Sequence, residues 1–144
     1  MAYDLLIRPA HLAVSLEVAE KLPDVRLIVD HIAKPNIARR DWNGWAAGIT
    51  ALARCPNVAC KLSGMITEAD WRQWVPADLS PYVQHVLEQF GTDRVMFGSD
   101  WPVCLLAGTY TQVVEAVTVQ LARLSPDERE DVFGGTAAAW YGLA

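Results

Sequence analysis

A carboxylate and an imidazole each follow an apolar run of this sequence, where they could act together in proton transfer. Asp100 follows VMFGS in the stretch VMFGSDWPVC, and His31 ends the stretch VRLIVDH. A buried carboxylate without a partner loses its hydration, so Asp100 is costly there unless something uses its charge. An acid and a histidine at one site can bind a metal ion or take a proton from water. Each also has a structural alternative: backbone carbonyls can satisfy a core histidine, and Asp100 can form an Asx-turn.

Four further residues near the ends of apolar runs are candidates for substrate binding. Lys61 and Ser63 lie in VACKLSG, and the apolar neighbours of Lys61 predict that it faces inward and pairs with an acid or a substrate carboxylate. Arg8 could bind an anionic substrate, or could end its strand with the charge in solvent. Trp101 could line a pocket or belong to the core.

The elements that must position these residues are short apolar runs alternating with longer helical patterns. We predict strands over 4–7, 25–31, 58–64 and 93–100. We predict helices over 11–22, 42–55, 70–74, 81–90, 110–124, 125–133 and 136–143. Ser80 is the expected N-cap of the fourth helix, with Pro81 at its first position. Gly134 and Gly135 are expected to break the chain before the last helix.

Alternating strands and helices predict an α/β fold with a parallel sheet. In such folds the active site lies at the carboxyl ends of the strands, where His31 and Asp100 would meet. The sequence contains no linker, low-complexity stretch or close repeat, so we expect one domain over residues 1–144.

The composition excludes several classes of protein. The 144 residues are 52% hydrophobic, which is ample for a core, and carry a net charge of -5, which argues against a surface for nucleic acid or anionic membranes. No apolar run reaches the roughly 18 residues of a membrane span, and the first residues do not resemble a signal peptide. The three cysteines have no CxxC spacing and are expected to be reduced thiols, so we expect a cytoplasmic protein.

Four segments, taken together and in order, resemble the amidohydrolase superfamily, and its lactonase-like branch in particular. They are LIVDHIAKP, VACKLSGM, DRVMFGSDWPV and DVFGGTAAAWYGL. The fold of that family is a TIM barrel of eight βα units. The resemblance implies that the four predicted strands correspond to the last four of the barrel. The expected fold is therefore the C-terminal half of a TIM barrel, about four βα units.

The resemblance also implies an activity, the opening of a lactone of a sugar-derived or dicarboxylate substrate by an activated water. Asp100 would be the general base and then the acid, and His31 would polarise the carbonyl or bind a metal ion. Arg8, Lys61, Ser63 and Trp101 would orient the substrate. The branch includes metal-dependent and metal-independent members. Zinc is the first expectation, although His31 and Asp100 alone cannot supply three protein ligands.

The sequence departs from the family in lacking the HxH pair of the first barrel strand, and it is much shorter than the roughly 250 residues of such a barrel. An isolated half-barrel would expose two sheet edges, so we expect self-association or pairing with an N-terminal half-barrel. Two alternatives to a lactonase stay open. One is a catalytically inert structural domain, and the other is a decarboxylase of the same superfamily, which would release carbon dioxide.

Overall fold

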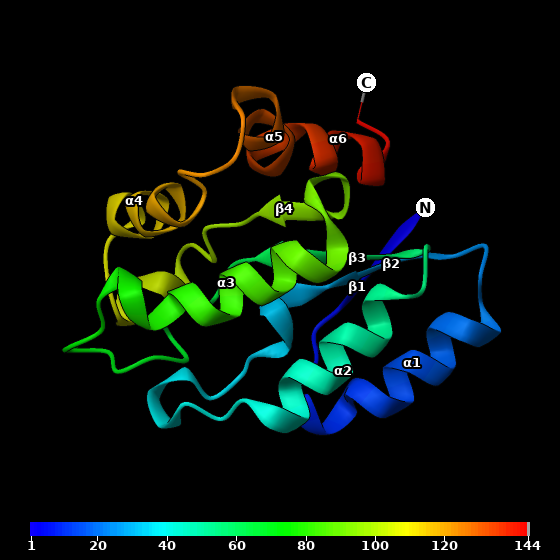
Figure 1. Cartoon of the computed structure of the whole chain (residues 1–144), viewed down its shortest axis with the longest axis horizontal. Coiled ribbons are helices and arrows are strands. Elements are labelled where there is room, and N and C mark those ends of the chain that lie inside the picture. The colour runs from blue at the N-terminus through cyan, green and yellow to red at the C-terminus, as the bar shows by residue number, and fades with distance from the viewer. Residues whose placement is uncertain (144) are drawn as a thin grey trace.

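The computed structural model describes residues 1–143, and a four-stranded parallel sheet lies at its centre (Figure 1). The strands follow one another in chain order: β1 (Ala2–Leu5), β2 (Arg26–Val29), β3 (Val58–Leu62) and β4 (Val95–Phe97). One row of the register runs Leu5, Val29, Cys60, Val95 across the whole sheet. The carboxyl ends of all four strands therefore reach one edge, as the predicted α/β fold requires.

Helices cover both faces of this sheet. They are α1 (Leu12–Lys21), α2 (Asn43–Ala53), α3 (Pro76–Phe90), α4 (Tyr110–Gln120), α5 (Pro126–Glu130) and α6 (Thr136–Tyr141). The larger core joins one face of the sheet to α1, α2, α3 and α4. On the other face, Ile28, Ala59 and Met96 pack with Ala137 and Trp140 of α6. Figure 1 shows α1 and α2 on one side of the strands and α6 on the other.

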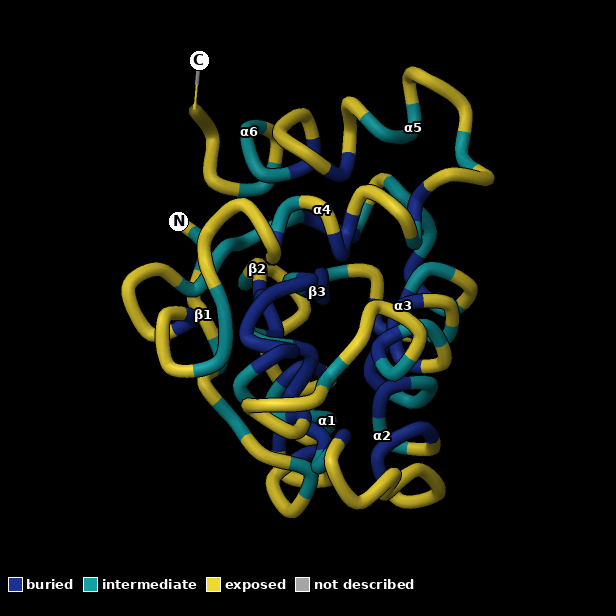
Figure 2. Tube along the Cα trace, turned by 90° about the vertical axis from the view of Figure 1, so that its left-hand side faces the viewer, coloured by how far each residue is buried: buried dark blue, intermediate teal, exposed yellow. Residues whose placement is uncertain are grey.

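Burial on both faces explains why the strands have continuous apolar sequences. In β2, Leu27 and Val29 belong to the larger core and Ile28 to the smaller one. Successive side chains of a strand point to opposite faces, so both faces must be apolar when both are covered. Figure 2, which looks toward the carboxyl-end edge, shows β2 and β3 buried inside a largely exposed shell.

The helix predicted over 81–90 starts earlier than expected. It begins at Pro76, whose fixed φ suits a first helical position, and Asp78 accepts the hydrogen bond of the preceding N-cap N–H at 2.9 Å. Ser80 and Pro81 lie inside the helix, so the prediction that Ser80 is the N-cap was wrong. Burial of one helix face, including Leu79, outweighs the hydrogen bond that Pro81 cannot donate.

The short helix predicted over 70–74 is a turn instead. The Asp70 carboxylate accepts hydrogen bonds from the N–H groups of Arg72 (2.9 Å) and Gln73 (3.2 Å). The Asp70 carbonyl also accepts from the N–H groups of Gln73 (3.2 Å) and Trp74 (3.0 Å), so side chain and backbone close the turn together. Pro76 follows closely, and its ring disfavours helical dihedrals in the residue before it.

Gly134 and Gly135 do not break the chain. Asp131–Gly135 forms a π-helical turn, η6, that joins α5 to α6, and Gly135 has helical dihedrals (φ -57°, ψ -48°). A Cβ atom on Gly135 would lie 2.9 Å from Oδ1 of Asp131. Glycine is therefore used here for close packing within a continuous helix rather than for a break.

Two further features concern the sheet edges and the length of the helices. The outer edges of β1 and β4 have no strand partner within residues 1–143. No helix in that range is long and apolar enough to cross a bilayer.

Candidate active site

His31 follows β2 after one residue, Asp30, and starts a left-handed turn. The four residues His31–Lys34 all have φ between 46° and 60°. Side chains other than glycine pay roughly 1–2 kcal/mol each for this conformation, so the surrounding packing must hold the turn. Trp45 does so from α2, where its indole N–H donates to the carbonyl of Ile32 at 2.7 Å. The ion pair of Lys34 with Glu68, at 3.1 Å, also holds the turn.

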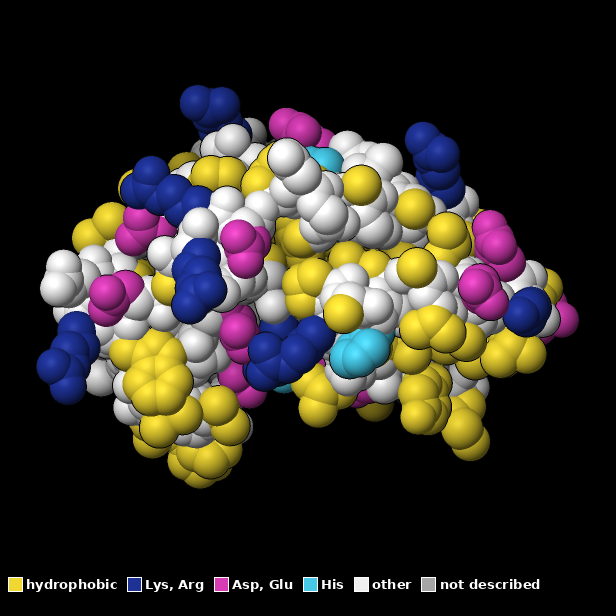
Figure 3. All heavy atoms as spheres, turned by 90° about the horizontal axis from the view of Figure 1, so that it is seen from below, with side chains coloured by type: hydrophobic (Ala, Val, Ile, Leu, Met, Phe, Trp, Pro, Cys, Tyr) yellow, Lys and Arg dark blue, Asp and Glu magenta, His cyan; other side chains and the backbone are white. Residues whose placement is uncertain are grey.

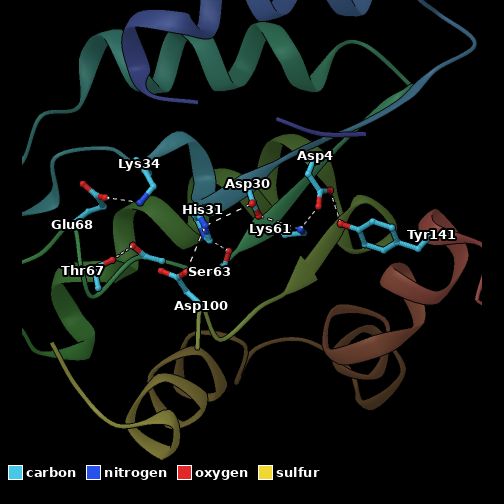
Figure 4. A network of polar contacts seen from close by, with 11 residues as sticks. Asp4, Asp30, His31, Lys34, Lys61, Ser63, Thr67, Glu68, Asp100 and Tyr141 are labelled. Carbon is cyan, nitrogen blue, oxygen red and sulfur yellow. Dashed lines mark hydrogen bonds and ion pairs between the residues drawn. The ribbon is translucent and has the colours of Figure 1, made fainter. Parts of the chain in front are cut away.

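The His31 ring is fixed on one side and faces two carboxylates on the other (Figure 4). Nδ1 lies 2.8 Å from Oγ of Ser63, which is buried. Nε2 lies 3.6 Å from Oδ2 of Asp30 and 3.7 Å from Oδ1 of Asp100, beyond direct hydrogen-bond length. Two carboxylates near Nε2 favour a proton on that nitrogen, so the Ser63 hydroxyl is assigned as the donor to Nδ1.

Gly64 makes room for this ring. It has φ +60°, and a Cβ atom there would lie 2.8 Å from Cγ and Nδ1 of His31. Both the backbone conformation and the close approach therefore require glycine after Ser63.

Asp100 sits after β4 with an unusual backbone and an unsatisfied side chain. Its φ is 56°, and its Oδ2 is buried with no hydrogen-bond partner within residues 1–143. An Asx-turn does not account for Asp100, because it would need the N–H of the residue two positions on, and Pro102 has none. The N–H of Trp101 donates to Oγ of Ser99 (3.2 Å). The structure thus shows the desolvation cost that the sequence predicts for Asp100. One of its carboxylate oxygens is buried beside an imidazole and has no partner from the described chain.

Lys61 joins β3 to β1, to the loop after β2 and to α6. Its Nζ lies 3.0 Å from Oδ2 of Asp4 and 3.1 Å from Oδ1 of Asp30, and Tyr141 donates its hydroxyl to Oδ1 of Asp4 at 2.5 Å. Burial acts to lower the pKa of Lys61, but hydrogen bonds with Tyr141, Asp4 and Asp30 outweigh it and raise the pKa above its ordinary value. The prediction that Lys61 faces inward and pairs with an acid is confirmed.

Replacing Lys61 with Met is expected to lower the free energy of unfolding by about 2 kcal/mol, because it leaves Asp4 and Asp30 without their cation. The pKa of Lys61 is raised in the folded state, so its contribution is complete below the ordinary lysine value of about 10.4 and is lost as the pH rises above it. Urea unfolding of both proteins across that range measures the difference. The control is Lys21→Met, an exposed pair with Glu17, which should cost under about 0.5 kcal/mol. Equal losses in the two variants would contradict the assignment.

Arg8 and Trp101 lie outside this network of contacts. Arg8 is exposed, and its backbone N–H donates to Nδ1 of His11 at 3.1 Å. Trp101 directly follows Asp100, but its side chain is 64% exposed, so it is not part of the core. The structure thus brings together Asp100, His31 and Ser63, links Lys61 to them through Asp30, and leaves Arg8 and Trp101 at the periphery.

Sequence reasoning missed the partners of these residues. Asp30 precedes His31 and Asp4 interrupts an apolar strand, so both positions carried a signal: a polar residue inside an apolar run. Tyr141 carried none, because its hydrogen bond with Asp4 spans 137 residues of sequence. Such a contact follows from the packing of α6 on the sheet and not from any local pattern.

The described residues do not by themselves fit a zinc site. Zinc sites in proteins use three or four protein ligands. Residues 1–143 hold no cluster of three His, Cys, Asp or Glu side chains suited to a metal ion. His31 and Asp100 supply one imidazole and one carboxylate with an unpartnered oxygen, so further ligands would have to come from outside the described chain.

The cysteines take no part in this site. Cys55, Cys60 and Cys104 are free and buried. Burial raises the pKa of all three thiols, and nearby carboxylates add to the effect. Thiols of this kind are poor nucleophiles, which argues against Cys104 as a nucleophile.

A parallel sheet with a histidine and an aspartate at the ends of two of its strands defines an α/β protein with a rim site, as in βα-barrel enzymes. The chain belongs to the amidohydrolase family, whose model, described as Amidohydrolase, matches residues 3–143. L-fucono-1,5-lactonases of Burkholderia multivorans and Burkholderia ambifaria are 42% and 41% identical, over 85% and 98% of this chain. The chain spans about half the length of these relatives, 48% and 50%.

Solved structures confirm the predicted half-barrel. An amidohydrolase of Burkholderia multivorans, solved with bound zinc, superposes with a TM-score of 0.95 at 39% identity, over 99% of this chain and 53% of that one. A putative 2-pyrone-4,6-dicarboxylic acid hydrolase of Pseudomonas putida, 22% identical, shares the fold with a TM-score of 0.78, over 98% of this chain and 51% of that one. The described strands and helices therefore correspond to half of an amidohydrolase barrel.

Proposed function

We propose that this chain carries the proton-transfer half of a lactone hydrolase site, with Asp100 as general base. The observation that carries the proposal is the buried, unpartnered Oδ2 of Asp100 beside Nε2 of His31. A water molecule that donates to this oxygen would gain a strong acceptor and would satisfy the carboxylate. The lactonase relatives support a sugar-derived lactone as the substrate.

In the proposed reaction Asp100 takes a proton from water as the water oxygen attacks the lactone carbonyl carbon. The ring C–O bond then breaks, and the same proton passes from Asp100 to the leaving ring oxygen. The product is an open-chain hydroxy acid, and Asp100 returns to the carboxylate. His31, held at Nδ1 by Ser63, would donate from Nε2 to the carbonyl oxygen and stabilise its developing charge. Lys61 would act indirectly, by holding Asp30 beside His31.

We further propose that four strands from outside the described chain complete the barrel. The outer edges of β1 and β4 are unpaired within residues 1–143, and the large apolar side chains exposed nearby include Tyr3, Leu6, Trp101, Leu105 and Leu106. Figure 3 shows exposed apolar side chains gathered in two groups along one edge of the molecule, with charged and histidine side chains between them. Open sheet edges and apolar patches of this kind favour association. Any zinc ion at the site would need ligands from that other half.

The activity is tested with L-fucono-1,5-lactone, by following acid release from the chain alone and from the chain mixed with the first half of the Burkholderia multivorans lactonase. Light scattering after gel filtration reports association in the same samples. We expect turnover in the mixture together with a complex larger than the single chain. A stable complex without turnover would support the inert structural domain. Release of carbon dioxide in a parallel assay, with an aromatic acid in place of the lactone, would support the decarboxylase. A monomer in both samples would contradict the proposed completion of the barrel.

A further inference from the structure

A cavity opens at the carboxyl-end edge of the sheet, next to the left-handed turn that begins at His31. Its volume is about 720 Å³, within the range of roughly 300–1,000 Å³ typical of small-molecule sites. Segments that follow β1, β2 and β3, together with the start of α2, contribute its main side chains: Arg8, Lys34, Asn36, Trp42, Thr67 and Glu68. Neither His31 nor Asp100 lines it, but Lys34 belongs to the same left-handed turn as His31.

The charges around this cavity favour a ligand that carries one negative group and several hydroxyls. Lys34 is already paired with Glu68 at 3.1 Å. Arg8 is exposed and has no ion-pair partner within residues 1–143, so its guanidinium can accept a carboxylate in a bidentate contact. Asp41 and Glu68 also line the cavity, and carboxylates accept hydrogen bonds from hydroxyl groups. A second negative group on the ligand would meet these acids and be repelled.

One wall of the cavity is a fixed aromatic ring. Trp42 is 36% exposed, and its indole packs against Trp45 and Tyr82, with ring centroids 5.3 and 5.4 Å away. Trp45 is anchored through its hydrogen bond to Ile32. A supported indole face presents apolar surface at little entropic cost, which suits the C–H face of a polyol.

We propose that this cavity binds an open-chain sugar acid, a polyol with a single carboxylate. The carboxylate would pair with Arg8, the hydroxyls would bond to Asp41, Glu68 and Asn36, and the carbon chain would lie against Trp42. The inference rests on the proposed function for its source, because opening a sugar lactone yields a compound of this class. Arg8 is thereby assigned to a product site next to the reacting pair and not to the reacting pair itself.

Three probes separate the parts of the ligand: gluconate carries both features, sorbitol lacks the carboxylate, and propionate lacks the polyol. Calorimetry and amide NMR shifts of the full chain measure binding of each. We expect gluconate to bind, with shifts at Trp42 and the Arg8 segment, and the other two probes to bind at least about 10-fold more weakly, a difference of about 1.4 kcal/mol. Propionate binding as tightly as gluconate would overturn the proposal.

Two glycines provide a matched pair of variants. A Cβ atom on Gly44, which lines the cavity, or on Gly134, which lies in η6, would meet no atom within 4 Å. Gly44→Met should fill the cavity and abolish gluconate binding without disturbing the fold, while Gly134→Met should leave it unchanged. Arg8→Gln should weaken it at least about 10-fold, the cost of one charge-assisted contact. Gluconate binding that survives Gly44→Met would overturn the site.

Lactone hydrolysis and sugar-acid binding can be tested independently of each other. Asp100→Asn should keep gluconate binding, since Asp100 does not line the cavity. Lactone hydrolysis without gluconate binding would overturn only the sugar-acid site. Gluconate binding at Arg8 without hydrolysis would overturn only the proposed reaction.

Discussion

Replacing Asp100 with Asn is expected to reduce kcat/KM for lactone hydrolysis by about 10³-fold, because a general base contributes on that order. The same change should raise the free energy of unfolding by about 1 kcal/mol, because it removes the charge from a buried and unpartnered oxygen. Asparagine also tolerates the φ of 56° at this position. A variant that loses activity while it gains stability is typical of a carboxylate that serves catalysis and not the fold.

Initial rates of acid release, measured with the complementing half present, give the first effect, and urea unfolding of the chain gives the second. Asp24→Asn is the matched control, since Asp24 is exposed in the turn after α1 and should change stability by less than about 0.5 kcal/mol. Full activity in Asp100→Asn would remove Asp100 from the mechanism. A loss of 2 kcal/mol or more in stability would make its charge structural.

Replacing Gly64 with Ala is expected to destabilise the chain by about 3 kcal/mol and to displace His31. The new Cβ atom would lie 2.8 Å from Cγ and Nδ1 of the imidazole, and alanine disfavours the φ of +60°. The ring cannot move aside freely, because Ser63 holds Nδ1 and the left-handed turn fixes its backbone. Relief of the clash requires the ring to shift against these contacts, which costs stability. Hydrolysis should fall as well, because the shifted ring would no longer lie beside Asp100.

Urea unfolding measures the stability of Gly64→Ala, and ring NMR signals report His31, since the chain has only three histidines. Gly134→Ala is the control: this glycine is exposed and has open space at Cβ, so the change should be neutral or stabilising by up to about 1 kcal/mol. An unchanged His31 signal in Gly64→Ala would show that the ring does not depend on the missing side chain.

Much of the architecture was predictable from sequence because the sheet is buried on both faces. Continuous apolar runs indicated all four strands, and the alternation with helices predicted the parallel order. The first strand was misplaced by two residues: β1 is Ala2–Leu5, whereas the prediction was 4–7. Element ends were less predictable. Ser80 and Pro81 look like the start of a helix, yet burial of Leu79 and neighbouring apolar residues carries α3 back to Pro76. The free energy gained by burying apolar side chains can exceed that of a local capping interaction, so packing decides where such a helix begins.

The sequence by itself determined the fold class, the family resemblance and the two residues, His31 and Asp100, most suited to proton transfer. These follow from local chemistry: apolar periodicity, and polar residues placed where apolar runs end. Only the tertiary structure decided which groups meet. Tyr141 reaches Asp4 across 137 residues, Gly64 yields its side-chain space to His31, and Oδ2 of Asp100 is left buried without a partner. The physical reason is that close packing of distant segments, and not the pattern within any one of them, fixes side-chain contacts and desolvation.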